Sequence, residues 1–122
     1  MKKILIVEDN QILAENFARV FRNDFEVFQA DSASDAILKI DQKMPDLIFL
    51  DILLNGHSAF SLLNELQSYA DTAKIPVVIC SNLAEDLDLK ALRNYGVKCV
   101  LDKAETDPRE ILKKAKEVCA TD

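Results

Sequence analysis

The stretch of sequence that decides the fold is Asp46-Leu47-Ile48-Phe49-Leu50-Asp51, in which four apolar residues run without interruption into a carboxylate. Pro45 precedes the run and the turn-forming pair Asn55-Gly56 follows it. A short apolar run bounded by such residues is typical of a buried strand in a parallel sheet. We therefore predict that Asp51 lies at the carboxyl end of a central strand, where ligands gather in open α/β sheets. Taken alone, the stretch supports a plain turn or helix-cap role for Asp51 equally well, because Asp is common in turns.

Further apolar runs alternate with amphipathic segments along the rest of the chain. Strands are predicted at residues 3–7, 25–29, 77–80 and 99–101. Helices are predicted at residues 11–22, at 31–44, from about 59 to 70, around 87–95 and from 107 onward. Ile12 and Phe60 are among the apolar residues whose helical spacing marks the first and third helices. Gly96 is predicted to end the fourth helix as a left-handed cap.

Five strand–helix units predict an α/β protein with a parallel sheet covered on both faces by helices. The predicted fold class is a single-domain, doubly wound, five-stranded parallel sheet of flavodoxin-like order 2-1-3-4-5, a (βα)5 three-layer sandwich. Residues 1–122 are predicted to form one stand-alone domain, and the chain offers no segment long enough for an output domain.

Composition narrows the range of functions. The chain has 49% hydrophobic residues, a net charge of −6 and an isoelectric point near 4.8. This acidity argues against direct nucleic-acid binding, and no apolar run approaches the length of a membrane span. We expect a soluble, cytoplasmic monomer. Three cysteines without C-x-x-C spacing form neither a disulfide framework nor a zinc motif, and only Cys119, near the C-terminus, is a candidate for exposure.

Polar residues follow four of the five predicted strands. Glu8 and Asp9 follow the first, Asp51 the third, Ser81 the fourth and Lys103 the fifth. Because parallel strands end at the same edge of a sheet, these side chains are expected to converge. Any one of them alone is weak support, since Lys and Ser after a strand are commonly a solvated charge and a turn former.

The converging residue types suit phosphoryl transfer. Three carboxylates held close together repel one another unless some are protonated or a cation joins them. Magnesium prefers oxygen ligands and commonly shares them with a phosphate. A carboxylate can act as the nucleophile and form an aspartyl phosphate, while a lysine and a metal ion stabilise the charge on the phosphoryl oxygens.

Along its whole length, the sequence resembles the response-regulator receiver domains of two-component signalling. Four segments carry the resemblance: Ile4-Leu5-Ile6-Val7-Glu8-Asp9-Asn10, Asp46-Leu47-Ile48-Phe49-Leu50-Asp51, Ile75-Pro76-Val77-Val78-Ile79-Cys80-Ser81, and residues 96–103 ending in Lys103. They match the family's acidic pair, phospho-acceptor strand, switch Ser/Thr strand and lysine segment.

The resemblance implies a role for each site residue. Asp51 would accept a phosphoryl group, and Ser81 and Lys103 would bind the phosphoryl oxygens. Mg²⁺, with Mn²⁺ as a substitute, would be held by Glu8, Asp9, Asp51 and the backbone carbonyl of Leu53. The donor would be a histidine kinase, a histidine phosphotransfer protein or acetyl phosphate. The protein would be a signalling switch rather than an ordinary enzyme, catalysing only its own phosphotransfer and dephosphorylation and changing its binding to a downstream protein.

Several positions depart from the family pattern, including Ala59, where Gly is common, and Lys98-Cys99, where an acidic pair is usual. Val100 stands where an aromatic residue usually reports phosphorylation, Asn55 replaces a Pro, and Ala104 follows the lysine where Pro is common. Two alternatives therefore stay open at this point. One is a receiver-like interaction module that does not use phosphate, which the complete set of charged residues disfavours. The other is a hydrolase with an aspartyl intermediate, which would need a second Asp where this chain has Leu53.

Overall fold

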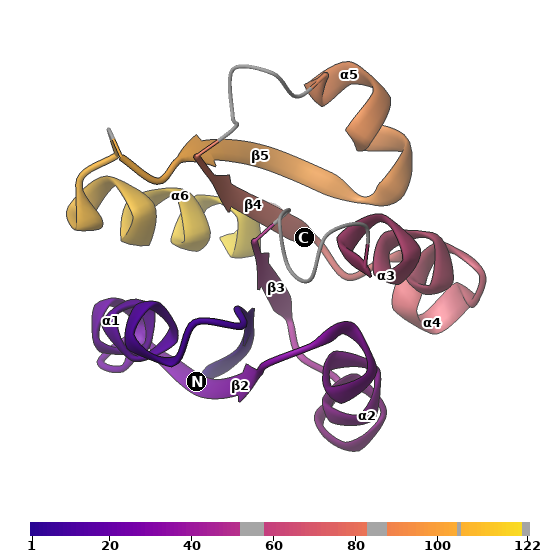
Figure 1. Cartoon of the computed structure of the whole chain (residues 1–122), viewed down its shortest axis with the longest axis horizontal. Helices are drawn as coiled ribbons and strands as arrows, with labels where there is room; N and C mark the ends of the chain where they lie inside the picture. Colours follow the sequence, from indigo (N-terminus) through magenta and orange to yellow (C-terminus); the bar gives the residue numbers. More distant parts are fainter. Residues whose placement is uncertain (52–57, 83–87, 105, 121–122) are drawn as a thin grey trace.

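The fold is a parallel five-stranded sheet between two layers of helices, seen in a computed structural model that describes residues 1–51, 58–82, 88–104 and 106–120 (Figure 1). The strands, in chain order, are β1 (Lys2–Val7), β2 (Phe25–Ala30), β3 (Leu47–Leu50), β4 (Val77–Ser81) and β5 (Val97–Asp102). The helices are α1 (Gln11–Phe21), α2 (Ala33–Lys43), α3 (Ser58–Gln67), α4 (Ala70–Ala73), α5 (Leu89–Leu92), the short 3-10 helix η2 (Arg93–Tyr95) and α6 (Pro108–Ala120).

The strand order is β2-β1-β3-β4-β5, and every neighbouring pair is parallel. This order confirms the predicted fold class. β3 lies at the centre of the sheet, and all four of its residues are buried. A strand that is covered on both faces has no solvent-facing side, which explains why apolar and polar residues do not alternate in residues 47–50.

The helices divide into two layers, each with its own apolar core (Figure 1). On one face, α1 and α6 pack on the sheet through a cluster that includes Phe21, Phe49 and Ile111. On the other, α2, α3 and α5 pack through a cluster that includes Ile40 and Leu63. Because successive strand residues point to opposite faces, each buried strand contributes to both clusters.

Capping residues set several helix boundaries. The side chain of Asn10 accepts a hydrogen bond from the Leu13 N–H, and Ser32 does the same for Asp35 at the start of α2. Asp107 precedes Pro108 at the start of α6, as predicted, and its carboxylate accepts from the Arg109 N–H.

Gly96 ends η2 in the left-handed conformation that was predicted, with φ of 82°. A Cβ at this position would lie 3.0 Å from the Gln67 side-chain nitrogen and 3.5 Å from the Ile75 carbonyl oxygen. Both the backbone conformation and the close contacts therefore favour glycine here.

Helical spacing did not decide the burial of every apolar side chain. Ile12 is 75% exposed and Phe60 is 45% exposed, because Ala14, Ala18 and Leu62 take the sheet-facing positions of their helices instead. Cys119 is buried rather than exposed, because it lies on the face of α6 that packs against the sheet.

Several element boundaries also differ from the prediction by one to three residues. The third helix ends at Gln67, and the separate short helix α4 follows it. β5 begins at Val97, two residues earlier than predicted, because it pairs with β4 from Val77 onward. No described helix is both long and apolar enough to cross a membrane.

Candidate functional site

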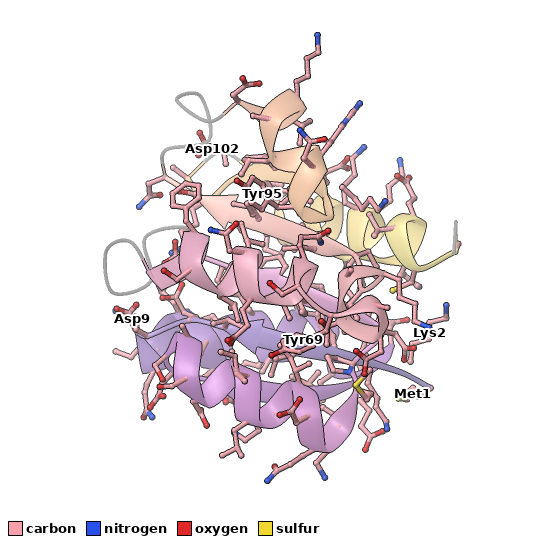
Figure 2. The ribbon with its side chains drawn as sticks, turned by 90° about the vertical axis from the view of Figure 1, so that its right-hand side faces the viewer. Met1, Lys2, Asp9, Tyr69, Tyr95 and Asp102 are labelled. Atoms are coloured by element: carbon pink, nitrogen blue, oxygen red, sulfur yellow. The ribbon has the colours of Figure 1, made fainter. Side chains whose placement is uncertain are left out.

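The candidate site is built where β1, β3, β4 and β5 end. Backbone hydrogen bonds between neighbouring strands place its residues: the Asp51 N–H donates to the Val7 carbonyl at 3.1 Å, and the Lys103 N–H donates to the Ser81 carbonyl at 3.1 Å. Figure 2 shows Asp9 and Asp102 on one side of the molecule, and Met1 and Lys2, at the start of β1, on the other. The strand register therefore assembles residues that are far apart in the sequence.

The Lys103 ammonium group bridges two carboxylates. Its Nζ lies 2.9 Å from Glu8 Oε1 and 2.9 Å from Asp51 Oδ2. The side chains are largely buried, with 12%, 2% and 9% exposure for Lys103, Glu8 and Asp51. Charge-assisted hydrogen bonds of this length hold both carboxylates in place.

Asp9 adds a third carboxylate to the pair. One carboxylate oxygen each from Glu8, Asp9 and Asp51 lies within 4.8 Å of the others. Glu8 and Asp51 are buried, whereas Asp9 is exposed at the mouth of the site. Such a set of oxygen donors, open to solvent on one side, suits a hard divalent cation that keeps some of its water ligands. The acidic triad therefore fits the metal that the sequence predicted.

Burial and hydrogen bonding act in opposite directions on the pKa values of Glu8 and Lys103. Burial raises the pKa of Glu8 above its ordinary value, and the charge of Asp51 adds to that effect, while hydrogen bonds from Lys103 and the Asn10 N–H oppose it. Burial alone would lower the pKa of Lys103, but its hydrogen bonds to Glu8 and Asp51 outweigh burial and leave this pKa raised. Lys103 therefore carries its positive charge in the folded protein.

Ser81 lies at the end of β4 and is fully buried next to the site. It pairs with Asp102 in the β4–β5 register, one residue before Lys103. The other predicted ligand, the backbone carbonyl of Leu53, lies outside the described residues, as does Asn55.

Asn10 has a part in the site that sequence reasoning did not assign. Its backbone N–H donates to Glu8 Oε2 at 3.2 Å, while its side chain caps α1. Glu8 therefore accepts hydrogen bonds from both Asn10 and Lys103. The signal in the sequence was an Asn directly after an acidic pair and before a helix, which is a capping pattern.

Cys80 precedes Ser81 but is expected to be chemically inert. It is 1% exposed, and burial raises the pKa of its thiol to about 12. We expect Cys80 to react with iodoacetamide at pH 8 more than about 100-fold more slowly than in unfolded protein, because reaction requires opening of the sheet. Peptide mapping by mass spectrometry along a urea gradient measures this.

The half-buried Cys99, which is also in a strand, serves as the internal comparison. Alkylation of native Cys80 as fast as that of Cys99 would contradict the expectation.

The sign of the pH dependence of stability follows from the raised pKa of Cys80. Between pH 9 and about 12 the unfolded chain loses this proton while the folded protein keeps it, so stability falls as the pH rises through that window.

The sheet order and the acidic edge define the class of protein, an α/β protein with the CheY-like fold. The structure of a CheY-like response regulator receiver domain from Methylobacillus flagellatus superposes with a TM-score of 0.81 at 24% identity, covering 97% of this chain and 98% of that one. The family model of the response regulator receiver domain matches residues 4–116. The chain therefore belongs to the response regulator receiver domain family, and it is a signalling protein rather than a classical enzyme.

Two curated relatives differ in how much of their own length the similarity covers. Protein PilH of Pseudomonas aeruginosa is 27% identical over 121 residues, which cover 98% of this chain and 99% of PilH. The phosphate regulon transcriptional regulatory protein PhoB of Escherichia coli is 29% identical over 118 residues, 96% of this chain but 51% of PhoB. The similarity thus extends to a protein of the same length and to one that is about twice as long.

Proposed function

We propose that the protein is a phosphorylation-dependent switch of a two-component system or phosphorelay, with Asp51 as the phosphoryl acceptor. The observation that carries the proposal is the Lys103 ammonium group, 2.9 Å from both Asp51 and Glu8, beside the exposed Asp9. A nucleophilic carboxylate needs positive charge next to it when the phosphoryl oxygens arrive, and Lys103 is already in that place.

In the proposed step, an Asp51 carboxylate oxygen attacks the phosphorus of a phosphohistidine on a histidine kinase or phosphotransfer protein. An O–P bond forms, the N–P bond breaks, and the electron pair of that bond leaves with the imidazole. Lys103 and the Ser81 hydroxyl bind phosphoryl oxygens, so negative charge is balanced as it moves onto Asp51. Glu8 keeps Lys103 oriented throughout the transfer.

A divalent metal ion bound by Glu8, Asp9 and Asp51 would neutralise charge on the transferring group. Mg²⁺ suits this role best, because it binds through few carboxylates and retains water and phosphate ligands. Asp9, as the exposed member of the triad, is the residue that an incoming hydrated ion would meet first. The proposed reaction is therefore magnesium-dependent.

The output of the switch is a population shift between two conformations of the same chain. A phosphoryl group on Asp51 adds negative charge next to Ser81 and Lys103. Ser81 is the last residue of β4, and Lys103 directly follows β5 and donates its N–H to the Ser81 carbonyl. Val100, a half-buried residue of β5, packs against the apolar core together with Leu89 and Tyr95. We propose that phosphorylation displaces β4, β5 and the adjoining helices, and that a downstream protein binds the displaced surface. This route does not use rotation of an aromatic side chain, because position 100 is Val.

The test is phosphorylation by a small donor. With Mg²⁺ and acetyl phosphate, intact-mass spectrometry should find one added phosphoryl group on the wild-type protein and none on Asp51→Asn, because the amide cannot act as the nucleophile. The matched control is Asp46→Asn, which removes an exposed Asp at the other end of the same strand and should leave the adduct unchanged.

Chelation of the metal should suppress the adduct on the wild-type protein. An adduct that persists in Asp51→Asn would place the acceptor elsewhere. Absence of any adduct, with acetyl phosphate or phosphoramidate, would favour an interaction module that is not regulated by phosphorylation.

A further inference from the structure

A groove lies between α2 and the α3–α4 segment, on a part of the molecule that the proposed phosphoryl chemistry does not use. Its volume is about 310 Å³. The apolar residues that line it are Ile37 and Ile40 of α2, Leu66 of α3, and Tyr69 at the start of α4. Figure 2 shows Tyr69 between α2 and the α3–α4 segment, well separated from Asp9 at the acidic edge. We call this feature the α2–α3 groove.

The rim of the α2–α3 groove is acidic. Asp41, Glu65 and Asp71 line it, and all three are exposed. The lysines of α2 are engaged on the other side of the helix: Lys39 Nζ donates to the Gln29 carbonyl at 2.8 Å, and Lys43 Nζ lies 5.3 Å from the centre of the Phe28 ring. Among the described residues that line the groove, every charged side chain is therefore negative.

The floor and wall of the groove can hold apolar side chains. Tyr69 forms an exposed wall, since it is 61% exposed although it is large and partly apolar. Ile37 is half-buried, and Ile40 and Leu66 form a buried floor with 1% and 4% exposure. An exposed aromatic side chain beside an apolar floor marks a surface that a partner can cover. A groove between two helices matches the shape of a third helix, whose residues at i, i+3 or i+4, and i+7 provide the anchors.

We propose that the α2–α3 groove binds an amphipathic helix of a partner protein, with leucine-like side chains on Tyr69, Leu66 and Ile37 and with Lys or Arg facing Asp41, Glu65 and Asp71. The opposite charges select the partner and speed its encounter, while the buried apolar anchors hold it. The groove is remote from Asp51, so the helix and a phosphoryl donor can bind at the same time.

A second copy of this chain is the other candidate occupant. Its α6 displays Arg109, Lys113 and Lys116 along one face. This face fits the groove less well, because Leu112 is its main apolar residue and is already half-buried, and because Lys116 Nζ is paired with Asp24 at 3.0 Å. The observations therefore favour a partner helix over self-association.

The probe for the experiment is a synthetic helical peptide of about 18 residues, long enough to be helical in water, with Leu on one face and Lys on the other. The same peptide with Glu in place of every Lys is the charge control. Titration into ¹⁵N-labelled protein should shift the amide resonances of residues 37–41 and 65–72 and leave those of residues 8–10 unchanged. The Glu peptide should not bind.

Two triple variants separate the groove from general charge attraction. Asp41→Asn/Glu65→Gln/Asp71→Asn should weaken peptide binding about tenfold or more, because all three negative charges that face the peptide lysines are removed. Glu26→Gln/Glu110→Gln/Glu117→Gln removes the same number of exposed carboxylates elsewhere and should weaken binding less than about twofold. Tyr69→Ala, which removes an exposed wall residue, should also reduce the affinity without lowering the urea midpoint.

Three results would overturn the proposal. Equal weakening by both triple variants would mean non-specific attraction to an acidic protein. Resonance shifts centred outside residues 37–41 and 65–72 would place the peptide elsewhere. Concentration-dependent dimerisation in sedimentation equilibrium, abolished by the groove variant, would assign the groove to a second copy. None of these measurements requires phosphorylation, so failure here leaves the proposed function of Asp51 untouched.

Discussion

Replacement of Lys103 by Met is expected to lower the free energy of unfolding by about 3–5 kcal/mol at neutral pH, because removing one partner leaves buried charge uncompensated. Glu8 and Asp51 would both lose the ammonium group that lies 2.9 Å from each of them. Methionine has a similar length and fills the space, so the loss is electrostatic. Urea denaturation monitored by circular dichroism measures the change.

Three comparisons make this expectation specific. Lys98→Met, which changes an exposed lysine of β5, the strand that precedes Lys103, should alter stability by less than about 0.5 kcal/mol. Glu8→Gln combined with Lys103→Met should recover much of the loss, because one of the two uncompensated charges is then absent. Saturating Mg²⁺ should stabilise Lys103→Met more than the wild-type protein, since the ion replaces the missing cation.

The pH dependence has a definite sign. The pKa of Glu8 is raised in the folded protein, so the folded state binds this proton more tightly than the unfolded chain does. The contribution of Glu8 to stability therefore falls as the pH rises from the ordinary glutamate range through the folded pKa. Without Lys103 this fall should be steeper, and the difference between Lys103→Met and the wild type should shrink as the pH is lowered. A difference that stays constant across this range would contradict the electrostatic account.

Truncation of Phe49 to Ala is expected to cost about 3–5 kcal/mol, the range for removing a fully buried aromatic side chain. Phe49 is 2% exposed on the central strand. Its ring centre lies 4.8 Å from that of Phe17 and 5.2 Å from that of Phe21, in edge-to-face arrangements. Loss of Phe49 leaves a cavity between α1 and the sheet, and it removes both ring pairs.

Phe60→Ala is the matched control, because it removes the same atoms from a position that is 45% exposed. Its expected cost is about 0.5 kcal/mol or less. The measurement is the urea midpoint at constant m-value for each variant. Equal losses for the two variants would mean that burial does not decide the contribution of these rings.

Much of the fold could be predicted from residue order alone. Uninterrupted apolar runs such as Leu47–Leu50 mark strands buried on both faces, and their alternation with helices leaves few chain paths that obey right-handed connection. The helix-stop signals at Met44 and Gly96 were also local, and both residues adopt the left-handed conformation. Such features depend on a few neighbouring residues, so the sequence displays them directly.

The exposure of individual side chains was harder to predict. Ile12 and Phe60 have the spacing of buried helix residues, yet small or better placed neighbours such as Ala14 and Leu62 face the sheet. A helical stripe wider than the contact with the sheet always leaves some apolar residues outside, and the sequence does not say which. Cys119 shows the converse, since its position near the C-terminus suggested exposure and its helix face buries it.

By itself, the sequence determined the fold class, the family and which residue types follow each strand. Because all strands of a parallel sheet end at the same edge, it also predicted that these residues lie near one another. Only the tertiary structure decided how those residues meet. Lys103 forms its ion pairs with residues 95 and 52 positions away, and the strand register and burial set these contacts. The α2–α3 groove likewise exists only where two helices pack side by side, since its apolar wall and acidic rim come from separate segments of the chain.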